Sequence, residues 1–116
     1  MAEALPGIEI IKSRFLVLLK ERQCVIAGHA LAAWEGTDQD KVRSHLNAVQ
    51  STLHQISGSA GSLGFVSLGL AAHECENKLI AHLEGPNGNS VPFPIEVMGQ
   101  MDAFVSLSQS LLVDGL

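Results

Sequence analysis

The stretch VRSHLNAVQSTLHQISGSAGSL, residues 42–63, decides the fold that this sequence predicts. Its apolar residues recur in alternating steps of four and three, and this spacing keeps side chains on one face of an α-helix. Thr37 stands before the stretch as a suitable N-cap, and Asp38 and Asp40 follow it, where carboxylates favour the positive end of a helix dipole. The pattern predicts a helix of about seven turns that ends near Gly64. Its buried stripe should consist of Val42, Leu46, Val49, Leu53, Ile56, Ala60 and Leu63.

Three further helices are predicted around this one. Helical spacing and end signals place them over about residues 8–34, about residues 66–83 and about residues 94–114. Residues 84–93 are rich in Gly, Pro and Asn and indicate a loop. Because no strand-like alternation or long linker interrupts the chain, we expect a single all-α domain over residues 1–116, an antiparallel up-down-up-down four-helix bundle. The first helix is indicated by Ile8, Ile11, Phe15, Leu18, Leu19, Arg22, Val25 and Ile26.

The composition argues against several classes of protein. Seven Lys and Arg residues against twelve Asp and Glu residues give a net charge of −5, whereas nucleic-acid-binding modules carry a basic face. The first residues lack the basic start and apolar core of a signal peptide, and the longest apolar runs are too short to cross a membrane. We interpret Cys24 and Cys75 as reduced thiols of the core, with a disulfide as the alternative. We therefore expect a cytoplasmic protein that binds neither nucleic acid nor a membrane.

A group of polar and small residues shares a second face of the central helix. Its members lie on a face centred roughly 115° from the apolar stripe. Two of them are glycines, each of which lowers helix stability by about 0.8–1.0 kcal/mol relative to Ala. A patch without side chains beside an imidazole lets a phosphoryl group or another molecule approach the backbone. The alternative is a solvated histidine beside small residues that only permit close helix packing. The group consists of Gln50, His54, Ser57, Gly58 and Gly61.

The sequence HQISGSAGSLGF, residues 54–65, followed by Leu68 and by Cys75-Glu76, resembles the signature of histidine-containing phosphotransfer (HPt) domains. The motif region 54–76 begins on the second of four helices, where that family carries it. The resemblance implies that His54 accepts a phosphoryl group, usually on Nε2. It also implies that Glu76 accepts a hydrogen bond from Nδ1–H of this histidine, which fixes the tautomer and leaves Nε2 free to attack.

The same resemblance gives the glycines a role and exposes one departure. Gly58 matches the family glycine that clears space for the phosphoryl group, and Gly61 extends the bare surface. The family commonly has Lys three residues after the histidine, where this chain has Ser57. Neither Arg43 nor Lys78 is expected to replace that ammonium, because Arg43 lies three turns away and Lys78 should point to the other side of its helix. The phosphohistidine of this chain is therefore expected to be less well stabilised.

The function implied is that of a phosphoryl carrier without an ATP site. Its partners would be the receiver domains of response regulators and of hybrid histidine kinases, or a histidine kinase itself. They would dock over a surface centred on Gln50, His54, Ser57, Gly58 and Gly61. The protein itself should need no cofactor, since Mg²⁺ is expected on the receiver, and it is expected to be a monomer. The alternative is a degenerate HPt-like module that binds receivers without being phosphorylated.

Two other kinds of site compete less well. Five histidines suggest a metal site, and His73-x-x-Glu76 places two potential ligands on adjacent turns. Di-iron bundles require Glu-x-x-His on two helices and further glutamates, which are missing here, so we expect no metal site. A nucleophilic cysteine is disfavoured because Cys75 lies on the inner face of its helix, with His73 on the other side. The remaining histidines, His29, His45 and His82, are interpreted as flank or core residues.

Overall fold

A computed structural model describes residues 6–114 of the chain. This part consists of four long helices joined by short connections, and it contains no strand. A one-turn 3₁₀ helix, η1 (Gly61–Leu63), directly follows the second helix. The prediction of an all-helical domain is confirmed. The helices are α1 (Pro6–Glu35), α2 (Gln39–Ala60), α3 (Val66–Glu84) and α4 (Ile95–Asp114).

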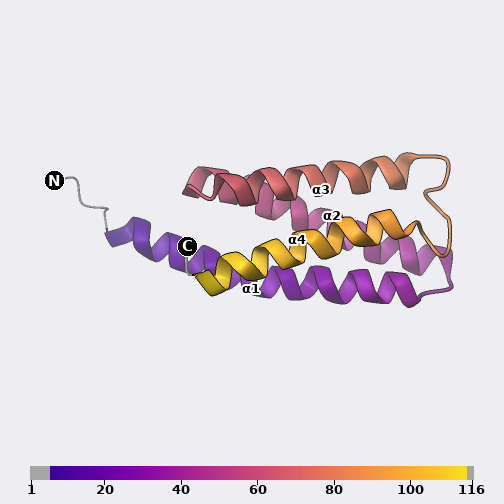
Figure 1. Cartoon of the computed structure of the whole chain (residues 1–116), viewed down its shortest axis with the longest axis horizontal. Coiled ribbons are helices and arrows are strands. Elements are labelled where there is room, and N and C mark those ends of the chain that lie inside the picture. The colour runs from indigo at the N-terminus through magenta and orange to yellow at the C-terminus, as the bar shows by residue number, and fades with distance from the viewer. Residues whose placement is uncertain (1–5, 115–116) are drawn as a thin grey trace.

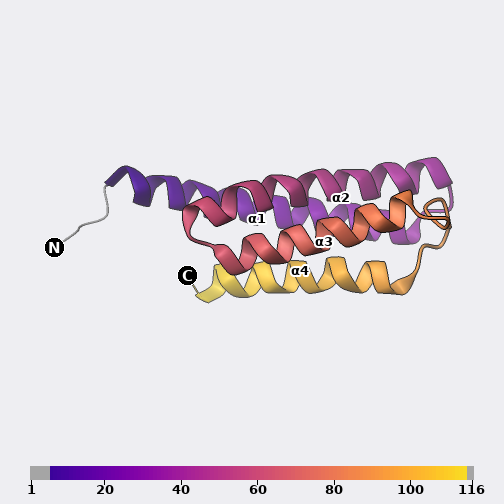
Figure 2. The same ribbon diagram turned by 90° about the horizontal axis from the view of Figure 1, so that it is seen from above.

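The four helices lie side by side in a bundle that measures 56 × 21 × 19 Å (Figures 1 and 2). Contacts join α1 to α2, α2 to α3, α3 to α4 and α4 back to α1. The first turns of α1 project beyond the ends of the other three helices in both views. Within residues 6–114, no helix is long and apolar enough to cross a membrane.

The apolar stripe of α2 forms the centre of the core. All its members are buried except Leu63, which belongs to η1 and packs partly buried against the core. Gly64 ends this segment with φ of 90°, a left-handed conformation that favours glycine, and its N–H donates to the carbonyl oxygen of Gly61. Because the chain leaves α2 at this point, α3 can fold back along it. The buried residues of the stripe are Val42, Leu46, Val49, Leu53, Ile56 and Ala60.

The apolar pattern of α1 was only partly a guide to its buried face. Phe15, Leu19 and Ile26 are buried, whereas Ile8, Ile11, Leu18 and Val25 are exposed. α1 carries apolar residues around almost its whole circumference, so the helical period does not by itself select the side that faces the core. Ile8 and Ile11 belong to the first two turns of α1 (Pro6–Glu35).

Two smaller expectations were wrong. The N-cap of α2 is Asp38 rather than Thr37, because the Asp38 carboxylate accepts the backbone N–H groups of Asp40 and Lys41. Cys24 is exposed on α1 and does not belong to the core, whereas Cys75 is buried, and both thiols are free.

The loop between α3 and α4 closes one end of the bundle. Phe93 is buried and meets Trp34 edge to face, with ring centroids 5.3 Å apart. Arg43 on α2 donates to the carbonyl oxygen of Gly88 and to Oδ1 of Asn89, each at 3.2 Å. The Arg43 guanidinium is therefore engaged with this loop.

Candidate functional site

His54 lies on the solvent side of α2 because it directly follows Leu53, a buried member of the stripe. A step of one residue turns a side chain by about 100° around a helix, which takes His54 out of the core. Its side chain is 73% exposed, while that of Glu76 on α3 is only 6% exposed. The site thus joins a solvent-facing imidazole to a carboxylate anchored in the interior.

Gly69 sets the distance between the two helices that carry this pair. A Cβ on Gly69 would lie 3.2 Å from the backbone nitrogen of Gly61 and 3.5 Å from Cβ of Ala60, so α3 and α2 come close at this level. Gly61 follows His54 by seven residues, and Gly69 precedes Glu76 by seven residues. Two turns from the glycine contact, the same register brings Glu76 opposite His54. Sequence reasoning did not identify Gly69 as important for the site, because its role depends on a contact between two helices.

The carboxylate of Glu76 holds two side chains of α2. Oε2 of Glu76 lies 2.9 Å from Nδ1 of His54 and accepts a hydrogen bond of 2.8 Å from Nε2 of Gln50. A carboxylate has no proton to donate, so Nδ1 of His54 is the donor. In the neutral imidazole, Nε2 then carries the free lone pair, as a nucleophile requires. The sequence placed Gln50 on this face, but its bond to Glu76 emerges only from the structure.

Gly58 and Gly61 leave bare backbone near this pair. Both are exposed, and a Cβ added to either would meet nothing within 4 Å. The sequence also allowed that these glycines are small in order to let a neighbouring helix pack closely. Among the described residues, no neighbouring helix lies against the position of a Cβ at either glycine, so this alternative does not explain them. Their absent side chains leave open space on the solvent side of α2, at Gly58, and at the start of η1, at Gly61.

Ser57 and Gly61 also border a shallow hollow between α2 and α3. On the α3 side the hollow is lined by Val66, Gly69, Leu70 and His73. Val66 and Leu70 are 57% and 65% exposed, so apolar surface lies next to the polar site. Sequence reasoning missed the role of these α3 residues, because the period of one helix does not show which exposed residues lie beside a neighbouring helix.

The cationic side chains considered for the site are engaged elsewhere. Lys78 pairs with Glu74 at 3.1 Å, and Arg43 contacts the α3–α4 loop. Ser57 donates its hydroxyl hydrogen bond to the backbone carbonyl of His54, at 3.1 Å. The position where the family carries Lys therefore holds a neutral group bonded to its own helix.

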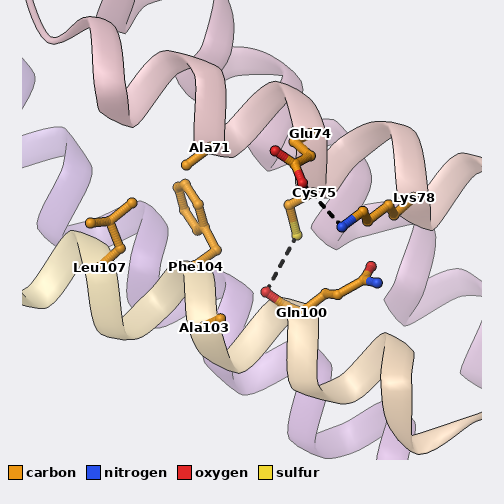
Figure 3. Close-up of a pocket in the computed structure, with 8 residues that line it drawn as sticks. All are labelled: Ala71, Glu74, Cys75, Lys78, Gln100, Ala103, Phe104 and Leu107. Atoms are coloured by element: carbon orange, nitrogen blue, oxygen red, sulfur yellow. Dashed lines mark hydrogen bonds and ion pairs between the residues drawn. The ribbon is translucent and has the colours of Figure 1, made fainter.

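The pocket between α3 and α4 has different chemistry (Figure 3). It includes no residue of α2, and Sγ of Cys75 points across it toward the carbonyl oxygen of Gln100, 3.7 Å away. Burial raises the pKa of Cys75 to about 11, so its thiol stays protonated near neutral pH. A protonated thiol is a poor nucleophile, which argues against cysteine chemistry here.

The remaining histidines lie apart from His54. His29 and His45 form a pair between α1 and α2, with their Nδ1 atoms 2.8 Å apart, an arrangement that sequence reasoning missed. His73 contacts Asn77, and His82 lies beside Phe93. Among residues 6–114, no group of three or more potential metal ligands converges.

Comparison with known families decides the class to which this arrangement belongs. The family model of the Hpt domain matches residues 19–106. The chain belongs to the Hpt domain family. The matched region contains every residue of the site described above. Comparison with curated proteins and with solved structures gave no significant match.

Membership gives the domain a general role. Hpt domains are phosphocarrier modules of two-component signalling rather than kinases, and they interact with receiver domains in phosphorelays. The resemblance detected from residues 54–76 is thereby confirmed. The match begins at Leu19, so residues 6–18 of α1 lie outside the part that the family model describes.

Proposed function

We propose that His54 accepts a phosphoryl group on Nε2 from a receiver-domain aspartate, or from a histidine kinase, and passes it to a response regulator. The observation that carries this proposal is the 2.9 Å contact between Nδ1 of His54 and Oε2 of Glu76. This contact holds the imidazole through Nδ1 and leaves Nε2, the proposed nucleophile, free. Family membership supports the role, because Hpt domains transfer phosphoryl groups in such relays.

The transfer needs little from this chain besides a positioned nucleophile. The Nε2 lone pair attacks phosphorus in line with the acyl phosphate bond, the N–P bond forms, and the P–O bond breaks to release the aspartate carboxylate. The phosphorylated ring carries a positive charge, with its proton still on Nδ1. The Glu76 carboxylate faces that proton and offsets the charge. The reverse sequence passes the group to the next receiver.

The receiver would dock over Gln50, His54, Ser57, Gly58 and Gly61. The bare backbone at the two glycines admits the phosphoryl group and the receiver's active site without a clash. The hollow beside Ser57 and Gly61 adds an apolar border at Leu70 for the same partner. Mg²⁺ and the cation that activates the acyl phosphate would come from the receiver, so this chain needs no cofactor of its own.

The wider setting follows from the same proposal. The helix contacts and short connections support an up-down-up-down antiparallel arrangement, in which the site lies on the side of the bundle rather than at an end. A carrier of this kind has no ATP site and depends on a separate kinase. Relays of this kind operate in the cytoplasm, where we place the protein.

A second candidate function is a degenerate module that binds receivers without being phosphorylated. The observation that favours it is Ser57, whose hydroxyl bonds its own helix and supplies no positive charge for a phosphoryl group. The intact contacts among His54, Glu76 and Gln50 favour the carrier, because binding alone does not require an oriented imidazole.

Phosphoryl transfer from a labelled receiver separates the two functions. Wild type should acquire an acid-labile, alkali-stable label, and His54→Gln should acquire none while still binding the receiver. His73→Gln is the matched control, because His73 is another exposed histidine at the border of the site. A wild type that binds the receiver but remains unlabelled would establish the degenerate module instead.

A further inference from the structure

The face of α1 that points away from the core is apolar, whereas the solvent-facing side of a helix is normally polar. Seven of the eleven exposed large aliphatic side chains in the described part of the chain belong to α1. Most of them form two adjacent rows with a spacing of seven residues. One row is Ile10, Val17, Cys24 and Leu31, and the other is Ile11, Leu18 and Val25; we call these two rows, together with Arg14 and Glu21 between them, the outer face of α1.

The exposure of this face is large. Val17 is 62% exposed, Ile10 and Ile11 are 52% exposed, and Leu18 and Val25 exceed 40%. Single exposed aliphatic residues are ordinary on a protein surface, but contiguous groups of them mark interaction sites. A seven-residue repeat is also the pattern that lets one helix pack along another.

Residues 7–11, at the start of α1, are all exposed and gain nothing evident from the bundle. The first turns of α1 project beyond the other helices, and the family model does not include residues before Leu19. Isolated helical turns are only marginally stable in water, and burying apolar side chains is what normally stabilises them. Ile10 and Ile11, in the first two turns of α1, are half exposed. A partner surface that covers these side chains would stabilise this part of the helix.

The two charges on the outer face have no partner within their own helix. The residues one turn from Arg14 are Ile10, Ile11, Val17 and Leu18, all of them aliphatic. Glu21 has Val17, Leu18, Cys24 and Val25 at the corresponding positions. Helical ion pairs form at separations of three or four residues, whereas Arg14 and Glu21 are seven apart. Each charge thus stands in an apolar surrounding and is available to a second molecule.

We propose that the outer face of α1 binds a second copy of itself, with the two helices antiparallel about a two-fold axis between Val17 and Leu18. In this register Arg14 of each copy meets Glu21 of the other, which gives two ion pairs. Val17 meets Leu18, Ile10 meets Val25, and Ile11 meets Cys24. The same face is therefore complementary to itself in both charge and apolar character, as a two-fold dimer requires.

The charges select this arrangement over the alternatives. A parallel pairing in register would place Arg14 against Arg14 and Glu21 against Glu21, and like charges in contact are unfavourable. Exposed ion pairs contribute little affinity, so the aliphatic contacts drive association and the charges fix direction. Sequence patterns alone gave an expectation of a monomer, because the outer face could be defined only once the buried side of α1 was known.

The first test is the mass of the protein in solution, measured by sedimentation over a wide range of concentrations. Wild type should associate to a dimer as its concentration rises, and Val17→Asp should raise the dissociation constant about tenfold or more. Leu70→Asp is the matched control, because Leu70 is 65% exposed on α3 and lies outside the outer face. Circular dichroism of each variant shows that it is folded. A wild type that stays monomeric throughout overturns the proposal.

Charge reversal tests the register. Arg14→Glu and Glu21→Arg should each weaken association, because each creates two like-charged contacts in the antiparallel dimer. The double variant should recover it, and a mixture of the two single variants should form heterodimers. In a parallel dimer, residue 14 faces residue 14 and residue 21 faces residue 21, so like charges are already in contact in wild type. Neither single variant would add a like-charged contact there. Association unchanged by the single variants, or unrecovered in the double variant, contradicts the antiparallel register.

A disulfide test places the two helices directly. Ile11→Cys should form a covalent dimer under mild oxidation, through Cys24 of the second copy. Ile11→Cys/Cys24→Ser should not, because residues 11 of the two copies would lie about 20 Å apart along the helices. Cross-linking that persists without Cys24 would contradict this register. A monomeric wild type in which Val17→Asp slows transfer from a receiver would assign the face to the receiver and overturn the dimer.

Discussion

Nδ1 of His54 and Oε2 of Glu76 lie 2.9 Å apart, although the first side chain is 73% exposed and the second only 6%. The buried carboxylate is also held by Nε2 of Gln50, at 2.8 Å. A solvent-facing imidazole is thereby fixed from the interior of the bundle. Its Nδ1 is engaged with Glu76, and its Nε2 is left without that carboxylate as a partner.

Replacing Glu76 by Ala should slow phosphoryl transfer to His54 by about ten- to hundredfold, because the imidazole loses its orientation. The tautomer should change as well, since no carboxylate then selects the proton on Nδ1. Nitrogen-15 chemical shifts of the histidine rings measure this directly. Transfer kinetics and tautomer that both remain as in wild type would show that Glu76 does not position His54. Glu74→Ala is the control, because Glu74 lies on the same helix and pairs with Lys78.

Gly58→Ala should make the protein more stable and less active. A methyl group at this position meets nothing within 4 Å, so the exchange gains helix propensity of about 0.8–1.0 kcal/mol. The same methyl group occupies the bare surface near His54 and should slow transfer from a receiver. Urea denaturation and transfer kinetics on one preparation measure both effects. A more stable variant that transfers at the wild-type rate would contradict the role given to this surface.

Gly69→Val should act in the opposite way on stability. A Cβ there already lies 3.2 Å from the backbone nitrogen of Gly61, so a branched side chain must push α3 away from α2. We expect a loss of about 1–3 kcal/mol in the free energy of unfolding, together with slower transfer, because Glu76 moves with α3. A variant as stable as wild type would show that the helices do not depend on this contact.

These two glycines also show how far sequence reasoning reaches. The face that carries Gly58 follows from the period of one helix, and so do the buried residues of α2. The role of Gly69 depends on which helices are neighbours and at what register, which no single helical period contains. For the same reason the Gln50–Glu76 bond and the His29–His45 pair emerge only from the structure.

The errors had local physical causes. Thr37 and Asp38 are adjacent and both suit an N-cap, and only the backbone geometry decides that Asp38 takes this place. Cys24 was expected in the core, but α1 is apolar around almost its whole circumference, so its helical period does not select the buried face. The exposure of Cys24 and of its apolar neighbours defines the outer face of α1.

Ser57→Lys should lengthen the lifetime of phosphorylated His54, because an ammonium group offsets the negative charge of the phosphoryl group. The present hydroxyl donates to the carbonyl oxygen of His54 and carries no charge. Ser57→Ala is the control and should leave the lifetime close to that of wild type. Loss of label after removal of the receiver measures the lifetime. A lysine variant that loses label as fast as the alanine variant would contradict a role for charge at this position.

His82 should make the domain less stable in acid. Burial lowers the pKa of His82, and the Arg43 guanidinium lowers it further. Nε2 of His82 is enclosed without a hydrogen-bond partner among the described residues, so protonation would bury an unpaired charge. The unfolded chain takes up this proton near the ordinary value of 6.5, whereas the folded chain does so only at lower pH. The contribution of neutral His82 to the free energy of unfolding is therefore complete at pH values above 6.5. It is lost as the pH falls below 6.5 and through the lower pKa of His82 in the folded protein.

Denaturation of wild type and His82→Leu at several pH values tests this account. The difference in unfolding free energy between the two should change as the pH falls from about 7.5 to about 5, with wild type losing more. His73→Gln serves as the comparison, because His73 is an exposed histidine of the neighbouring helical surface rather than an enclosed one. Parallel profiles for wild type and His82→Leu would exclude His82 as the source.

The most direct measurement of the central claim is long-range proton–nitrogen NMR on the protein after phosphorylation by a receiver. It reports which histidine carries the phosphoryl group and on which ring nitrogen. We predict phosphorus on Nε2 of His54 alone, with the proton retained on Nδ1 toward Glu76. Phosphorylation on Nδ1, on another histidine, or on none of them with a receiver bound would contradict the account.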